Sequence, residues 1–168
     1  MKERTRAFLS GGFWAGFIGY LTVVVIVALF NLAAGRSPFY TAALFGNALV
    51  FGETDPGSLV ITAAPVLAFN MIHLVVFLVL GFIASLCVIV GEQYPVGQYA
   101  LFAALLLVGL HLYAGLVLFG LPLLGSTAWW QVGVSGAAAA GTMGWYLLRV
   151  HPVLRRELSE LQWGETPS

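Results

Sequence analysis

Apolar residues are grouped into four long stretches along this chain, with short polar segments between them. Each stretch holds about 20 or more mostly apolar residues, enough to cross a hydrocarbon layer of about 30 Å at about 1.5 Å per helical residue. The pattern therefore predicts an all-α fold, an integral membrane four-helix bundle that forms a single polytopic transmembrane domain over residues 1–168. The predicted spans cover residues 8–34, 59–90, 99–119 and 128–148.

The connections between the predicted spans differ in length. Residues 91–98 and 120–127 are short connections, so spans two, three and four are expected to pack as successive antiparallel neighbours. The first connection is longer and contains an apolar segment at 38–51, with Ser37 as the predicted N-cap and Pro38 as the first helical residue. This segment is too short to span, which indicates a re-entrant or interfacial helix in the outer loop.

A polar tail at 149–168 follows the fourth span. Its apolar side chains recur on one helical face and most of its charged side chains fall on the others, as expected of a short amphipathic helix at a membrane surface. The apolar positions are Val153, Leu154, Leu158 and Leu161.

Basic residues are distributed unevenly about the predicted spans. Six of the seven Lys and Arg residues lie before the first span or after the fourth, and the seventh, Arg36, lies in the first loop. The positive-inside rule therefore predicts a multi-pass protein of the inner (plasma) membrane with cytoplasmic N- and C-termini. The first apolar run is longer than the roughly 7–15 residues of a signal-peptide core, so we expect an uncleaved first span.

Composition narrows the classes of function. Only 8% of residues are charged, against about 25% in typical soluble domains, and the formal net charge is zero, so no nucleic-acid partner is expected. The single cysteine, Cys87, lies within an apolar stretch and is expected to be an inert buried thiol. The sequence shows no nucleophile elbow, zinc-protease helix motif or phosphate-binding loop. These features favour a non-catalytic protein and predict no metal site.

Small residues recur at four-residue intervals in the first and fourth spans. Lipid supplies no hydrophobic drive between helices, so small residues are important because they allow backbones to approach closely. In the fourth span they define two faces. One is expected inside the bundle and the other is available to a partner helix, with both faces inside as the alternative. The predicted packing positions are Gly12 and Gly16 in the first span, and Gly133, Ala137, Gly141, Gly136, Ala140 and Gly144 in the fourth.

Ionisable residues at membrane depth are candidate functional groups. His73 lies in the second predicted span, with Asn70 one turn earlier on the same face, and His111 lies in the third. His73 is six residues further than His111 from Pro95 at the hairpin turn, a height difference of about 9 Å at about 1.5 Å per residue. This difference disfavours one haem b held by both histidines, whereas a single-histidine pigment site or a quinol hydrogen-bonded by His73 stays open. The simpler interpretation is hydrogen bonding between helices.

These patterns together predict a small non-catalytic membrane protein that is an accessory or structural subunit of a larger inner-membrane assembly. A respiratory or photosynthetic electron-transfer complex is the expected assembly. The expected contacts are with the lipid bilayer and with other transmembrane subunits, and no cofactor is predicted. Two alternatives stay open. One is a redox protein that binds quinone or haem b through His73, His111 and Asn70, and the other is an oligomeric transporter of small solutes.

Overall fold

The computed structural model describes residues 2–92, 109, 115 and 129–152 of the chain. The fold of these residues is all-helical, and none of them forms a strand. In chain order the elements are α1 (Lys2–Ala33), α2 (Tyr40–Phe51), the 3-10 helix η1 (Pro56–Ser58), α3 (Ala63–Gly91) and α6 (Trp129–Val150). The predictions of a third span and of an amphipathic helix after Pro152 fall on residues outside the described ranges, apart from Gly109 and Gly115.

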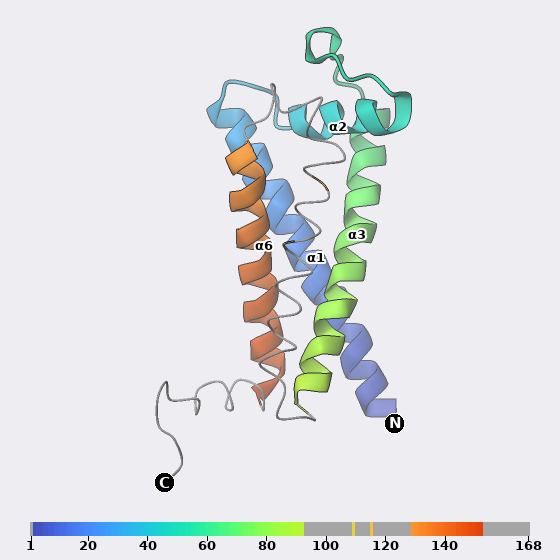
Figure 1. Ribbon diagram of the computed structural model, residues 1–168, viewed down its shortest axis with the longest axis vertical. Helices are drawn as coiled ribbons and strands as arrows, with labels where there is room; N and C mark the ends of the chain where they lie inside the picture. Colours follow the sequence, from blue (N-terminus) through green and yellow to red (C-terminus); the bar gives the residue numbers. More distant parts are fainter. Residues whose placement is uncertain (1, 93–108, 110–114, 116–128, 153–168) are drawn as a thin grey trace.

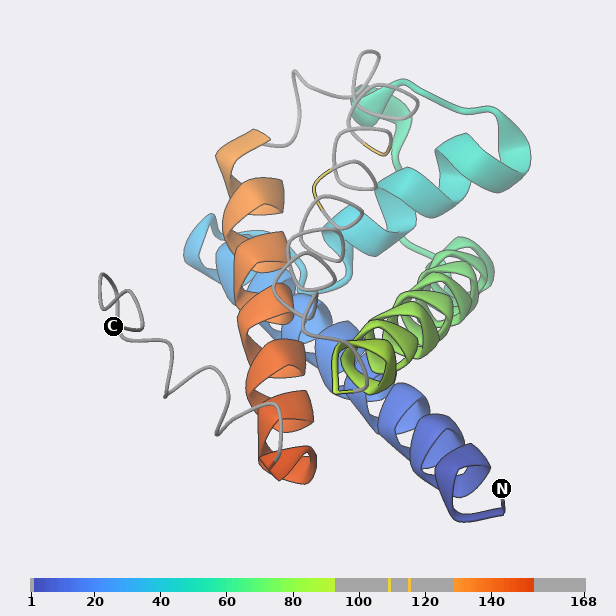
Figure 2. The ribbon, with the colours of Figure 1, turned by 60° about the horizontal axis from the view of Figure 1, so that its bottom comes forward.

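Three long helices run along one another, and α2 lies across one end of them (Figure 1). α1 runs towards the α2 end, whereas α3 and α6 run back in the opposite direction. α1 crosses the other two obliquely and packs against both, while α3 and α6 contact each other much less (Figure 2). α1 is therefore the central element of the described fold.

α1 and α3 are the two described helices that are long and apolar enough to cross a membrane. The qualifying segments, Thr5–Ala33 and Ala63–Gly91, each contain 29 residues, a length of about 43 Å at about 1.5 Å per residue. Apolar side chains occupy every face of both helices, whereas an amphipathic helix of a soluble protein confines them to one stripe. α6 forms the helix predicted at 128–148, but glycines and polar residues such as Gln131 lower its hydropathy.

α2 begins two residues later than the sequence pattern predicts. Tyr40 is its first residue and Phe39 is the N-cap, with no side-chain capping bond. Ser37 closes a turn instead, because its Oγ accepts a hydrogen bond from the Phe39 N–H (3.3 Å) and its carbonyl oxygen accepts one from the Tyr40 N–H (3.0 Å). The Pro38 carbonyl oxygen accepts a bond from the Asn31 amide (3.2 Å), which holds this residue in the turn and out of the helix.

Glycines end both α1 and α2. Gly35 and Gly52 have φ values of 69° and 71°, in the left-handed region that favours glycine. After Gly35, the Arg36 N–H donates to the Asn31 carbonyl oxygen (2.9 Å), which closes the last turn of α1. Because α1 ends before Gly35 and α2 ends at Gly52, α2 is a short separate helix that crosses the end of the bundle.

The α1–α3 crossing is built on glycine. A Cβ added at Gly81 of α3 would overlap the carbonyl oxygen of Gly12 and the backbone nitrogen of Gly16, both on α1. A Cβ added at Gly16 would lie 2.8 Å from the Cα of Leu78. All of these neighbours are backbone atoms, so a larger residue at these positions would force the two helices apart.

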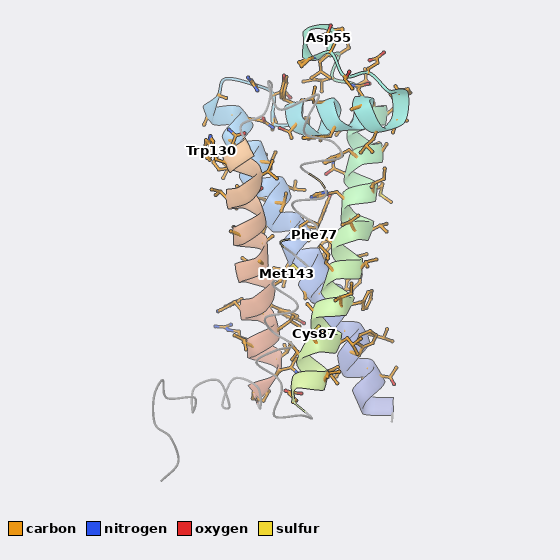
Figure 3. All side chains as sticks on the ribbon, in the orientation of Figure 1. Asp55, Phe77, Cys87, Trp130 and Met143 are labelled. Carbon is orange, nitrogen blue, oxygen red and sulfur yellow. The ribbon has the colours of Figure 1, made fainter. Side chains whose placement is uncertain are left out.

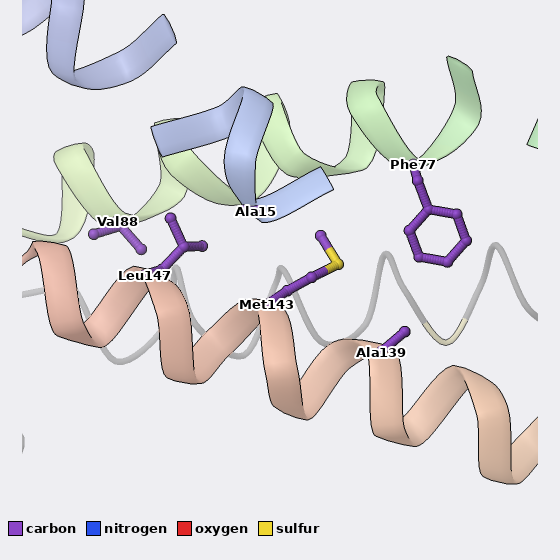
Figure 4. Packing of buried hydrophobic residues seen from close by; sticks show 6 residues of the cluster. All are labelled: Ala15, Phe77, Val88, Ala139, Met143 and Leu147. Carbon is purple, nitrogen blue, oxygen red and sulfur yellow. The ribbon is translucent and has the colours of Figure 1, made fainter. Parts of the chain in front are cut away.

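A small apolar cluster joins α1, α3 and α6 beside this crossing. Phe77 of α3 points towards Met143 of α6, with Ala15 of α1 between the two helices (Figure 4). Gly19 leaves room for Met143, since a Cβ there would lie 2.8 Å from the Met143 Cγ. The other members of the cluster are Val88, Ala139 and Leu147.

The crossing makes a direct prediction for stability. Gly81→Ala should lower the free energy of unfolding by roughly 1–3 kcal/mol, because the added methyl meets fixed backbone. Gly141→Ala on α6 is the matched control, since a Cβ there meets nothing within 4 Å and alanine favours a helix over glycine by about 1 kcal/mol. Unfolding of both variants in detergent measures the difference. Equal stability of the two variants would contradict the close crossing.

Candidate functional site

His73 lies on α3 within a column of aromatic rings. Phe69 and Phe77 stand one turn before and after it, with ring centroids 5.2 and 5.0 Å from the imidazole. Phe45 of α2 stacks on Phe69 at 5.6 Å, and the Tyr20 ring of α1 lies 6.4 Å from His73. The imidazole is partly buried and its Nε2 atom is shielded from solvent. Rings from α1 and α3 therefore surround this candidate residue, and the α2 ring of Phe45 extends the column beyond Phe69.

Asn70, another candidate residue, connects α3 to α1. Its side-chain oxygen accepts a hydrogen bond from the Tyr20 hydroxyl (3.0 Å), and its amide donates to the Val66 carbonyl oxygen (2.8 Å) one turn earlier on α3. The second bond fixes the orientation of the amide, so its oxygen is presented to Tyr20. The structure brings Asn70, His73 and Tyr20 together, whereas His111 lies outside the described residues.

A second polar group joins the end of α1 to α2. Asn31 is only 4% exposed, and its side-chain oxygen accepts a hydrogen bond from the Thr41 hydroxyl (3.0 Å). Asn47, further along α2, is also buried, and its amide donates to the Ala43 carbonyl oxygen (3.0 Å). The polar side chains of α2 thus point into the bundle. The bond from Thr41 to Asn31 holds α2 against the end of α1, whereas the Asn47 bond stays within α2.

Two threonines link α1 to α6. The hydroxyl oxygens of Thr22 and Thr142 are 3.0 Å apart. Each oxygen also lies within bonding distance of its own helix, at the Ile18 carbonyl oxygen (2.8 Å) and the Ala139 carbonyl oxygen (3.0 Å). A hydroxyl has one proton, so the three contacts share two protons. One threonine therefore donates across the interface while the other donates to its own backbone.

A buried histidine that the sequence analysis did not single out lies at the end of the bundle opposite α2. His151 directly follows α6, and its Nδ1 is 3.2 Å from Oε1 of Glu92, which directly follows α3. The side chains are 9% and 21% exposed, so the contact is largely shielded from water. The imidazole nitrogen and the carboxylate oxygen can share one hydrogen bond across this contact. The pair ties α3 to α6, two helices that otherwise contact each other little.

Ser85 lies at the same end, inside the α1–α3 contact. It is fully buried, and its hydroxyl donates to the Phe8 carbonyl oxygen (3.2 Å). A Cβ added at Gly11 would lie 3.0 Å from the Ser85 Oγ and 3.8 Å from the His151 Nε2. Serine, histidine and glutamate are the groups of a hydrolytic triad, but this hydroxyl is enclosed and bonded to backbone. The arrangement supports helix packing and not nucleophilic catalysis.

The two small-residue faces of α6 have different surroundings. Gly133, Ala137 and Gly141 are exposed, and a Cβ added at either glycine would meet no atom within 4 Å. The other face is less exposed, because Gly136 is buried and Ala140 and Gly144 are partly buried. A Cβ added at Gly144 would still meet no atom within 4 Å. One small-residue face of α6 is thus open at the surface of the described bundle.

Most of the polar contacts between the described helices involve residues other than the candidates His73, His111 and Asn70. Tyr20, Thr22, Thr142 and His151 were detectable as polar groups in or next to apolar helices, but their partners depend on how the helices cross. Within the described residues, no group of three or more His, Cys, Asp or Glu side chains is close enough to hold a metal ion. The groups present can bind helices together, carry a proton or hydrogen-bond a small headgroup.

The contact between His151 and Glu92 predicts coupling between the ends of α3 and α6. His151→Ala and Glu92→Ala should each lower the free energy of unfolding by roughly 1–2 kcal/mol, as for a hydrogen bond to a charged group. The double variant should lose clearly less than the sum, because both changes remove the same contact. Glu53→Ala, in the exposed turn after α2, is the control. Strictly additive losses in detergent unfolding would show that the two side chains do not interact.

Comparisons with known proteins add no family to this geometry. No protein-family model matches the chain, and no curated protein or solved structure shows significant similarity to it.

Proposed function

We propose that this protein is a multi-pass integral membrane protein that packs against other transmembrane subunits and does not catalyse a reaction. The surface of its helices supports the membrane location. In the most apolar windows of α1 and α3, only 17% and 28% of residues are buried within the chain. Large apolar residues such as Leu21, Val25, Leu67 and Val75 are exposed. Lipid or partner helices are the environments that suit a surface of this kind.

The distribution of charge supports the orientation that we propose. Arg6 near the start of α1 and Arg149 near the end of α6 belong to one end of the bundle, and Asp55 lies at the other, beyond α2 (Figure 3). The Arg149 guanidinium lies over the Trp145 ring, 4.2 Å from its centroid. Basic residues are enriched on the cytoplasmic side of membrane proteins, and tryptophan at both membrane interfaces. We therefore place the start of α1 and the end of α6 on the cytoplasmic side of an inner membrane.

The observation that carries the proposed role is the open face of α6, formed by Gly133, Ala137 and Gly141. Gly12 and Gly16 on α1 have the same four-residue spacing, and there the space is filled by the backbone of α3 and the Phe82 ring. The α6 face has no such neighbour among the described residues. In lipid, close packing of backbones is a main source of helix association. We propose that a transmembrane helix of another subunit occupies this face.

For the partner, we propose the assembly expected from the sequence, a respiratory or photosynthetic electron-transfer complex of the inner membrane. Two features of the chain support an accessory subunit of such a complex. Sixty per cent of its residues are hydrophobic, and the described segments between helices, 34–39 and 52–62, are short. Nearly all of the described mass thus belongs to helices, and these are suited to contacts within the bilayer.

The open α6 face predicts a variant that folds but does not assemble. Gly141→Leu should not lower the free energy of unfolding, because the side chain extends into open space and leucine favours a helix over glycine. It should abolish co-purification of partner subunits in mild detergent, because a bulky side chain prevents close helix approach. Val79→Leu enlarges an exposed residue on α3 and is the matched control. Normal assembly of Gly141→Leu would show that this face contacts lipid.

The surroundings of His73 favour a second candidate function, the binding of a quinone or haem b. Aromatic rings and hydrogen-bonding groups lie there on α1 and α3, and a quinone headgroup requires both kinds of contact. Tyr20 and Asn70 already bond to each other, however, so a ligand would have to replace that bond. The hydrogen bond between Tyr20 and Asn70 therefore supports a role in helix packing more strongly than a ligand site.

His73→Gln separates these two functions. If His73 only packs between helices, the variant should lose about 1 kcal/mol or less of stability, close to an ordinary hydrogen bond in a membrane protein. Tyr20→Phe is the companion variant, because it removes the bond to Asn70 and keeps the ring. Absorption spectra of the purified proteins should show no visible chromophore. A chromophore in the parent protein that is lost in His73→Gln would support the redox function instead.

A further inference from the structure

We infer that α2 and the extended segment after η1, residues 59–62, form a lipid-binding rim. This rim lies in the outer membrane interface and inserts apolar side chains among the lipid chains. The rim consists of Phe39, Val50, Phe51, Val60 and Ile61, which are 40–68% exposed. The inference rests on the proposed membrane location of α1 and α3. It adds a second contact with lipid, at the end of the bundle and parallel to the membrane surface.

The distribution of side chains about α2 is the first argument for this rim. The buried residues of α2 include the polar Thr41 and Asn47 beside the apolar Ala43 and Leu44. The exposed residues of α2, Val50 and Phe51, are both apolar, and so is the exposed Phe39 just before it. A helix that faces water carries polar residues on its outer side, whereas large apolar residues there suit contact with lipid.

The position of charge along this segment is the second argument. No charged residue occurs between Arg36 and Glu53, so all of α2 is uncharged. The Arg36 guanidinium lies over the Tyr40 ring, 4.6 Å from its centroid. An apolar helix flanked by an arginine on an aromatic ring is expected where hydrocarbon meets the headgroups. Glu53 and Asp55 then lie on the water side of the rim.

Close packing sets the depth of α2. A Cβ at Gly46 would overlap the carbonyl oxygen of Pro65, so α2 touches the backbone of α3 in its first turn. The rim continues onto the exposed residues Leu67 and Met71 of α3, without an intervening charged residue. An interfacial helix buries its apolar face roughly 5–10 Å into the boundary of the acyl chains. Continuity with the α3 surface favours lipid over a protein partner as the occupant.

Spin labels test the rim in the full-length protein. Single cysteines in a Cys87→Ser background would be labelled at Phe51 in the rim, at Met71 on α3 and at Thr54 in the exposed turn. The protein would be reconstituted in vesicles of phosphatidylethanolamine and phosphatidylglycerol. Collisions with oxygen, which concentrates in lipid, would be compared with collisions with a water-soluble nickel chelate. We expect an oxygen-to-nickel ratio at Phe51 several-fold above that at Thr54 and close to that at Met71.

The other outcomes separate the inference from the membrane location on which it rests. A ratio at Phe51 equal to that at Thr54, with Met71 in lipid, would overturn the rim and leave the membrane location intact. Low access of both reagents to Phe51 would also overturn it, because a protein partner would then cover the rim. Water-like ratios at both Phe51 and Met71 would contradict the membrane location itself. A label at Val50, the adjacent exposed position, repeats the test if Phe51→Cys folds poorly.

Discussion

Backbone contact between α1 and α3 is the constraint on which the other contacts depend. Gly12 and Gly16 on one helix and Gly81 on the other leave no room for a side chain at the crossing. The helices therefore meet at one fixed height. That height brings the Tyr20 hydroxyl to Asn70 on one side of the crossing and the Ser85 hydroxyl to the Phe8 carbonyl on the other. A larger residue at the crossing would alter both polar contacts together.

The interior of the bundle is polar in several places where the exterior is apolar. Asn31, Asn47, Ser85, Ser135 and His151 are all buried, and each makes a hydrogen bond within the chain. Large apolar side chains line the outside of α1, α3 and α6. Water would reverse this arrangement, because apolar burial drives folding there. In the membrane location that we propose, glycine contacts and internal hydrogen bonds supply the specificity instead.

The existence of the helices could be predicted from the sequence more easily than their contacts. Long apolar stretches predicted helices where α1, α3 and α6 occur, and a short apolar segment after Pro38 predicted α2. The N-cap prediction at Ser37 was wrong because the Asn31 amide, which belongs to α1, donates to the Pro38 carbonyl oxygen and holds Pro38 in the turn before α2. The contact between His151 and Glu92 joins residues far apart in the sequence, so no local pattern indicates it. Membrane insertion, the partner subunit and any role of His111 stay predictions.

Formation of an engineered disulfide between α1 and α3 in native membranes tests the central claim most directly. A Cβ at Gly11 would lie 3.9 Å from the Ser85 Cβ, close to the mean of about 3.8 Å in natural disulfides. Gly11→Cys with Ser85→Cys, in a Cys87→Ser background, should therefore oxidise readily and resist a thiol-reactive mass tag until it is reduced. Gly11→Cys with Val79→Cys, on the exposed side of α3, should stay reduced. Labelling of both cysteines in the first pair after oxidation would contradict the crossing on which this account depends.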